Sequence, residues 1–119
     1  MNEQAQAAPA RRDTLQAAAG TTTVALFGCA EKSIAAFRES SRFWPAVSLN
    51  DPARQVFETG DYDAGNVGGF RVRMTYSESE HLAKIEIKGA GPYYTDLGVD
   101  KAMTDFKGSL QVCLAATAD

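Results

Sequence analysis

The feature that most constrains the fold of this chain is a pair of segments in which apolar and polar residues alternate. FRVRMTY occupies positions 70–76, AKIEI occupies positions 83–87, and a polar, turn-like SESEHL lies between them. Alternation with a period of two places the apolar side chains on one face of a strand and the polar side chains on the other. The two segments therefore predict an antiparallel hairpin with one face in the core and one face in water.

The same alternation predicts the register of this hairpin. Both apolar sets share a face when Met74 lies opposite Ile85, and the neighbouring polar pair is then Arg73 opposite Glu86. An opposite-charge pair across two strands is favourable on the solvent face. A slip of one residue would turn every apolar side chain outward, so burial selects this register.

Residues 30–41 have the apolar spacing of a helix. Ile34 and Phe37 recur on one helical face of this segment, and Pro45 follows its end. Proline has no backbone N–H and its ring clashes with the preceding turn, so the helix has to end before it. The aromatic pair Phe43 and Trp44 offers either an exposed binding ridge or a lid over the core, and we favour the lid.

Residues 100–115 predict a second helix, with Asp100 as its N-cap. Its apolar stripe consists of Met103, Phe106, Leu110, Cys113 and Leu114. Gly108 lies inside the stripe and weakens a helix relative to alanine, so a last strand over residues 110–116 is the alternative. Gln111 and the alanines of this segment favour the helix.

Together these segments predict an α+β fold, in which a small antiparallel sheet of three or four strands carries two helices on one face. A short strand over residues 54–59 adds to the hairpin. The predicted core consists of Ile34, Phe37, Val72, Met74, Ile85, Ile87 and Phe106.

The segment RRDTLQAAAGTTTVALFGCA, at positions 11–30, has a different character. A pair of arginines precedes a weakly apolar stretch rich in alanine, glycine and threonine, which ends in Leu-Phe-Gly-Cys. This order resembles a bacterial twin-arginine export signal that ends in a lipoprotein cleavage box. The resemblance implies export, cleavage in front of Cys29 and attachment of lipid to Cys29. For the whole chain we expect residues 1–20 to be a signal-like or disordered segment ahead of a single α+β domain at residues 21–119.

A structural interpretation of the same segment stays open. Asp13 can cap a short helix over residues 15–19 that Gly20 ends, and residues 21–28 then form a strand rich in threonine. The two interpretations are compatible, because an uncleaved signal can order itself against the domain. For the uncleaved chain we expect residues 1–10 to be disordered, residues 21–27 to be a strand, and Cys29 and Cys113 to be reduced. If the segment is structural and the compartment oxidising, these cysteines can pair.

Composition excludes several classes of partner. The chain has 119 residues, a net charge of −3, 45% hydrophobic and 23% charged residues, which is ordinary usage for one globular domain. Lysine and arginine are nowhere dense enough to neutralise a row of phosphates, so no nucleic-acid partner is expected. No apolar run approaches the length of a membrane-spanning helix. We expect a monomer.

The loops contain the residues that come closest to a chemical site. Asp61, Asp63 and Asn66 offer oxygen atoms for calcium, but their spacing fails the helix-loop-helix calcium pattern and suits a plain turn. The only histidine, His81, lies in a charged loop tip, where a solvated side chain is expected.

Further candidates lie near the second helix. Tyr93 and Tyr94 could stack on a ligand, and Asp96 with Asp100 could form a carboxylate pair. No metal or cofactor is expected.

These observations predict a protein without catalytic activity. No nucleophile motif, zinc motif, nucleotide-binding glycine fingerprint or kinase signature occurs in the sequence. The leading hypothesis is a bacterial envelope or secreted protein in the periplasm, at the outer membrane or outside the cell. It would be a surface-exposed lipoprotein or antigen, with Cys29 as the candidate lipidation site. The alternative is a cytoplasmic domain that binds a small ligand or a partner, and an enzyme that uses the loop at residues 89–98 comes third.

Overall fold

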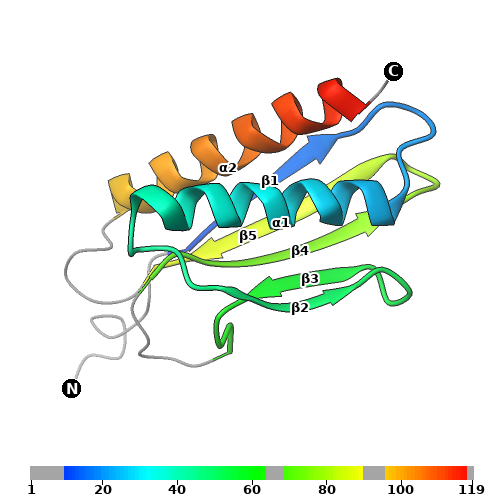
Figure 1. The fold of residues 1–119 in the computed structure, drawn as a ribbon. Helices are drawn as coiled ribbons and strands as arrows, with labels where there is room; N and C mark the ends of the chain where they lie inside the picture. The colour runs from blue at the N-terminus through cyan, green and yellow to red at the C-terminus, as the bar shows by residue number, and fades with distance from the viewer. Residues whose placement is uncertain (1–9, 64–68, 90–95, 118–119) are drawn as a thin grey trace.

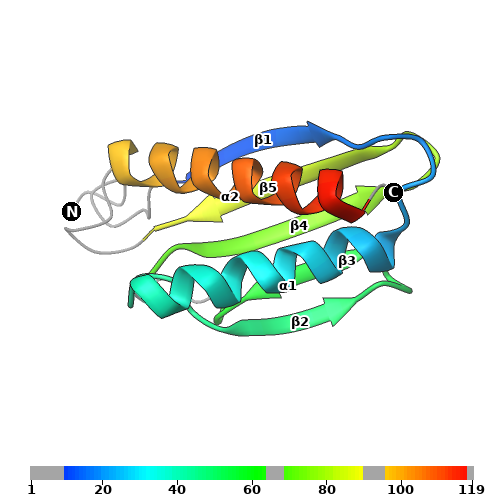
Figure 2. The ribbon, with the colours of Figure 1, turned by 45° about the horizontal axis from the view of Figure 1, so that its top comes forward.

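The computed structural model describes residues 10–63, 69–89 and 96–117, which form one antiparallel sheet and two helices. In chain order the elements are β1 (Ala10–Gln16), α1 (Thr23–Ser40), β2 (Val47–Asp51), β3 (Val56–Thr59), β4 (Arg71–Ser77), β5 (Leu82–Lys88) and α2 (Asp96–Thr117). The sheet has five strands in the order β1-β5-β4-β3-β2, and both helices lie on the same face of it (Figures 1 and 2). The predicted α+β class is confirmed, with one strand more than expected.

The hairpin of β4 and β5 is the predicted one. Met74 pairs with Ile85, Val72 with Ile87, and Arg73 lies opposite Glu86, so the predicted register is confirmed. The apolar members of both strands face the helices and are almost completely buried. Of the predicted core, only Phe37 is partly rather than fully buried.

The N-terminal segment folds differently from either detailed expectation. Residues 15–19 do not form a helix, because Ala10–Gln16 is strand β1 and pairs antiparallel with β5. Leu15, 4% exposed, is the one side chain of β1 that enters the core. A single buried residue in seven gives no alternation to detect, whereas the unpaired N–H and C=O groups of β5 offer a strong template for a strand. Residues 1–9 lie outside the described part of the chain.

Residues 21–27 are not a strand either. Helix α1 begins at Thr23 instead of Ala30, and the Thr22 side chain caps it by accepting a hydrogen bond from the Ala25 N–H at 3.1 Å. The first threonines therefore serve helix initiation rather than a pleated surface. Leu26 and Phe27 become fully buried on the same helical side as Ile34. That burial decides the conformation over the β-propensity of threonine.

Helix α2 runs through Gly108 without interruption, so the helix prediction for residues 110–116 is confirmed and the strand alternative is wrong. It packs against α1, where Ser33 and Ser109 share a hydrogen bond of 2.6 Å. One turn earlier in α1 and one turn later in α2, Cys29 and Cys113 form a disulfide, with their Cα atoms 5.7 Å apart. The expectation that both cysteines are reduced is therefore wrong for this structure. Their pairing is the alternative given above for a structural N-terminal segment, and no local pattern in the sequence links two residues that are 84 positions apart.

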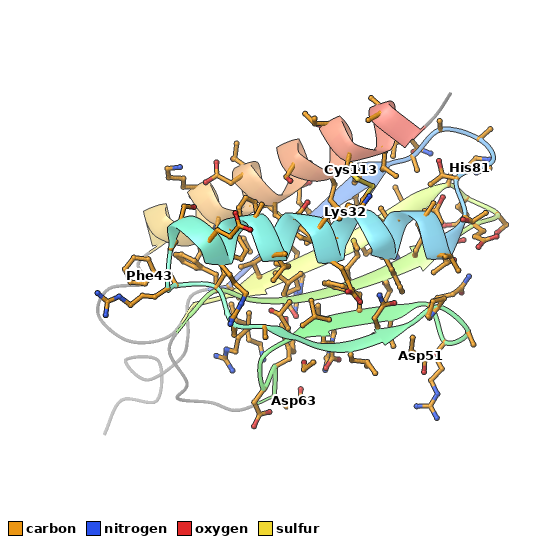
Figure 3. The ribbon with its side chains drawn as sticks, viewed as in Figure 1. Lys32, Phe43, Asp51, Asp63, His81 and Cys113 are labelled. Atoms are coloured by element: carbon orange, nitrogen blue, oxygen red, sulfur yellow. A yellow bond between two sulfur atoms is a disulfide. The ribbon has the colours of Figure 1, made fainter. Side chains whose placement is uncertain are left out.

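The aromatic pair after α1 folds back as expected. Trp44, 7% exposed, lies 4.6 Å from Phe37, 5.4 Å from Phe70 and 6.5 Å from Phe106 between ring centroids. Phe43 remains 46% exposed at the end of the helix layer (Figure 3). Neither helix in the described residues is long and apolar enough to cross a membrane.

Candidate functional site

The face of the sheet that the helices leave uncovered, here called the open face, carries a row of alternating charges. Arg12 on β1, Glu86 on β5, Arg73 on β4 and Glu58 on β3 lie opposite one another across the four strands. Arg12 Nε is 2.7 Å from Glu86 Oε2, and Arg73 Nε is 2.7 Å from Glu58 Oε2. The charges of this row balance one another, because each arginine has a carboxylate partner.

Tyr62, in the connection between β3 and β4, lies against the two middle members of the charge row, Glu86 and Arg73. Its hydroxyl donates a hydrogen bond to Glu86 Oε1, and its ring lies 4.3 Å from both Arg73 Cζ and Lys88 Nζ, measured to the centroid. A ring between two cations is stabilised by its quadrupole. Tyr62 is only 2% exposed.

The protonation states of Tyr62 and Glu86 follow from these contacts. Burial raises the pKa of Tyr62 far above its ordinary value, and the hydrogen bond to Glu86 raises it further. Burial acts to raise the pKa of Glu86, but the hydrogen bonds from Tyr62 and Arg12 outweigh it and hold that pKa below its ordinary value. The phenol stays protonated and the carboxylate stays charged near neutral pH, so the pair is a fixed structural contact rather than an acid and a base.

Arg71 holds the same connection against the end of the sheet. Its side chain is fully buried, and its Nη1 donates to the carbonyl oxygens of Asp61 and Tyr62 at 2.9 and 3.2 Å. Asp63, one of the predicted calcium ligands, is 3.2 Å from Arg73 Nη2 (Figure 3 shows its place below the sheet). Asn66, the third, lies outside the described residues. Within residues 10–63, 69–89 and 96–117, no three metal-ligating side chains gather.

A second row on the open face runs beside the charge row. Thr14 on β1, Lys84 on β5 and Thr75 on β4 lie opposite one another, and we call them the Lys84 row. No described carboxylate pairs with the Lys84 ammonium, and the two threonine hydroxyls form no hydrogen bond with a described residue. The Lys84 row therefore presents polar groups that form no ion pair or hydrogen bond with the part of the chain that the structure describes.

A shallow hollow of about 530 Å³ lies over both rows. It is lined by Arg12, Asp13, Thr14, Arg73, Thr75, Lys84, Ile85 and Glu86. The carboxylate of Asp13 is engaged on the helix side, 2.9 Å from Lys107 Nζ on α2. Besides Asp13, the charged side chains that line the hollow are Arg12, Arg73, Lys84 and Glu86. Arg12 and Arg73 are paired with Glu86 and Glu58, so Lys84 is the lining cation that has no carboxylate partner among the described residues. The open-face hollow therefore has one cation, Lys84, that is available to an anionic group.

Cys29 is the one site residue that the sequence named, and the structure places it away from the hollow. It lies in α1 on the opposite side of the sheet, 2% exposed, with its sulfur bonded to Cys113. Figure 3 shows this bond between the two helices. One sulfur atom cannot carry both a disulfide and a lipid. Lipidation of Cys29 remains a prediction for a cleaved form of the chain.

The remaining candidates do not meet the hollow. His81 is half-buried in the turn between β4 and β5, and its carbonyl accepts hydrogen bonds from Ala17 N–H and Gln16 Nε2 at 2.7 and 3.0 Å. Asp100 is 2.6 Å from Arg11 Nε on the helix side. The Asp96 side chain, Tyr93 and Tyr94 lie outside the described residues.

Sequence reasoning missed the residues that form the hollow. Lys84 and Thr75 were visible in the alternation as members of the polar face, but nothing marked them as a site. Arg12 and Thr14 belong to the segment that resembles an export signal, and only the pairing of β1 with β5 brings them to the same surface.

Comparisons of the chain with protein-family models, with curated proteins and with solved structures returned no match. Its function is therefore argued from its own residues, because a fold class alone implies no activity.

Proposed function

We propose that this chain is a non-catalytic protein of an oxidising bacterial envelope compartment or the extracellular medium, and that it acts by binding through its surface. The observation that carries the proposal is the disulfide between Cys29 and Cys113. Disulfides persist in the periplasm and outside the cell, whereas cytosolic thiols are kept reduced. The twin-arginine resemblance of residues 11–30, which shares Cys29 with the disulfide, also supports export.

The disulfide and the lipoprotein hypothesis make different demands on the chain. Cleavage in front of Cys29 removes β1 and the first residues of α1, and acylation consumes the Cys29 sulfur. In the described fold β1 pairs with β5 along its whole length, and Leu26 and Phe27 are fully buried. We therefore propose the uncleaved, disulfide-bonded chain as the working form, and the lipid-anchored surface antigen as the competing outcome.

A cytoplasmic binding domain is the second candidate function. The open-face hollow supports it equally well, because the hollow needs neither export nor a disulfide. What separates the two candidates is the state of the cysteines, since a cytoplasmic protein keeps both thiols reduced.

The test is to fractionate the cells that naturally make the protein, quench them in acid, and label thiols with a maleimide before and after reduction. We expect the chain in the envelope or the medium, with both cysteines labelled only after reduction and an intact mass two hydrogens below that of the reduced chain. Two free thiols in the cytoplasmic fraction would support the cytoplasmic alternative. A mass that begins at Cys29 and includes acyl groups would support the lipoprotein.

A further inference from the structure

We propose that the open-face hollow binds a monomeric amphiphilic anion, with Lys84 holding the anionic head and the aliphatic walls of the hollow contacting the apolar body. The proposal rests on the binding role given above and names the chemistry of the ligand. It does not depend on export, because the groups that carry it lie on the open face, away from the disulfide.

The charge of the head follows from which cations are already engaged. Arg73 is held by Glu58 and Asp63, and Arg12 engages Glu86 through Nε. Lys84 has no carboxylate partner among the described residues, and Arg12 has further N–H groups that the described contacts do not use. An anionic head above Lys84 therefore gains an ion pair without breaking an existing one.

The position of the head follows from the Lys84 row. Thr14 and Thr75 flank Lys84 on the two neighbouring strands. Adjacent strands are about 5 Å apart, so a group bound to the Lys84 ammonium can reach the hydroxyl of one of the two threonines. An ammonium with a hydroxyl donor beside it is suited to the oxygens of a carboxylate or a phosphate ester.

The apolar body follows from the walls of the hollow. The lysine and the two arginines contribute long aliphatic stems, and the threonines contribute methyl groups. A second hollow of about 250 Å³ shares Thr75 and Lys84. It adds Leu82, Tyr76 and the stem of Arg54 as apolar wall, and Gln55, Ser77 and Glu80 as polar wall. The two hollows extend the surface along β4 and β5 on both sides of Lys84, which favours an elongated ligand over a compact inorganic ion.

The size of the surface favours a small molecule. A volume of about 530 Å³ falls in the range of small-molecule sites, roughly 300–1000 Å³. The hollow lies on the hydrogen-bonded sheet, and two of its lining residues, Arg73 and Glu86, are held by ion pairs with Glu58 and Arg12. The site is therefore present before the ligand arrives, which lowers the cost of binding.

The experiment is a titration of the full, disulfide-bonded chain with small-molecule probes. Binding is monitored by two-dimensional amide NMR and by calorimetry. The probes are sodium octanoate as a monomer, sodium acetate as the head alone, and octanol as the tail alone. We expect octanoate to cause saturable changes in the amide chemical shifts of Thr14, Thr75 and Lys84. Acetate and octanol should bind much more weakly.

Matched variants test the role of Lys84. Lys84→Gln removes the cation from the open face, whereas Lys32→Gln removes an equal charge from the exposed side of α1 (Figure 3). We expect Lys84→Gln to weaken octanoate binding about fivefold, the upper range for an exposed ion pair, and Lys32→Gln to leave it unchanged. Thr75→Val should weaken binding by a smaller factor, because it removes a hydroxyl and keeps the shape.

Three outcomes would overturn the proposal. These are the absence of saturable octanoate binding, equal affinity for acetate and octanoate, and equal affinity of the Lys84→Gln and Lys32→Gln variants. Binding as expected by a chain that proves to be cytoplasmic and reduced would support this inference and reject export. A disulfide-bonded envelope protein that binds no octanoate would support export and reject this inference.

Discussion

On the face of the sheet that the helices cover, Val72, Met74 and Ile85 are at most 1% exposed. On the open face of the same two strands, Arg73 and Glu86 pair with charges on neighbouring strands, and Lys84 pairs with none that the structure describes. Adjacent residues of one strand thus have opposite roles. Burial of apolar area contributes far more to folding than exposed ion pairs do, so the covered face, rather than the open face, stabilises the domain.

The strongest test of the covered face is to remove the segment that precedes Cys29. A chain that begins at Cys29 loses Leu15, Leu26 and Phe27 from the core, as well as strand β1. Three such side chains are worth about 5 kcal/mol or more, which is comparable to the whole stability of a small domain. We expect this chain to show no cooperative thermal unfolding by circular dichroism, whereas the full chain does. A transition at a similar temperature in both would show that residues 10–28 are dispensable and would favour the cleaved lipoprotein.

A pair of neighbouring substitutions in β5 compares the two faces directly. Ile85→Ala should lower the free energy of unfolding by about 2–5 kcal/mol, because it leaves a cavity under the helices. Lys84→Ala, one residue away on the open face, should change it by less than about 0.5 kcal/mol. Urea unfolding with the disulfide intact measures both. Equal effects would mean that the open face is covered in solution.

Two tyrosines allow the same comparison for a single hydroxyl group. Tyr62 donates to the Glu86 carboxylate on the open face, whereas Tyr76 donates to the carbonyl of Thr21 at 2.9 Å. A hydrogen bond to a charged acceptor is the stronger kind, so Tyr62→Phe should lower the free energy of unfolding by about 1–2 kcal/mol and Tyr76→Phe by about 1 kcal/mol or less. The reverse order in urea unfolding would show that Tyr62 does not hold its loop in place.

The smallest expected effect is a dependence on pH from Glu86. Its pKa is lowered in the folded chain, so its contribution to stability is present above its ordinary unfolded pKa and is lost as the pH falls through the folded value. We expect Glu86→Gln to reduce the acid-induced loss of stability by a few tenths of a kcal/mol. Glu80→Gln, in the exposed turn between β4 and β5, serves as the matched control. If the free energy of unfolding falls with pH by the same amount in both variants, Glu86 does not make this contribution.

The sequence predicts the structure of the hairpin and of α2 better than that of the N-terminal segment. The hairpin of β4 and β5 was predicted with its register, and α2 was predicted as a helix, because each has a periodic apolar pattern that burial on one side explains. The segment from Arg11 to Ala30 was predicted wrongly in detail. Strand β1 has one buried side chain, Leu15, and the threonines at the start of α1 satisfy a helix cap as well as a strand.

The sequence by itself determined which side chains of β4 and β5 face the core, since a period of two leaves one register that buries them all. The tertiary structure alone decided that Arg11 and Arg12 belong to the sheet, because the free edge of β5 supplies the hydrogen-bond partners. It also decided the disulfide between Cys29 and Cys113. These residues are 84 positions apart in the sequence, and only the packing of α1 against α2 brings them together. The Lys84 row has the same origin. Thr14, Lys84 and Thr75 come from three strands, and a site assembled across strands has no local signal in the chain.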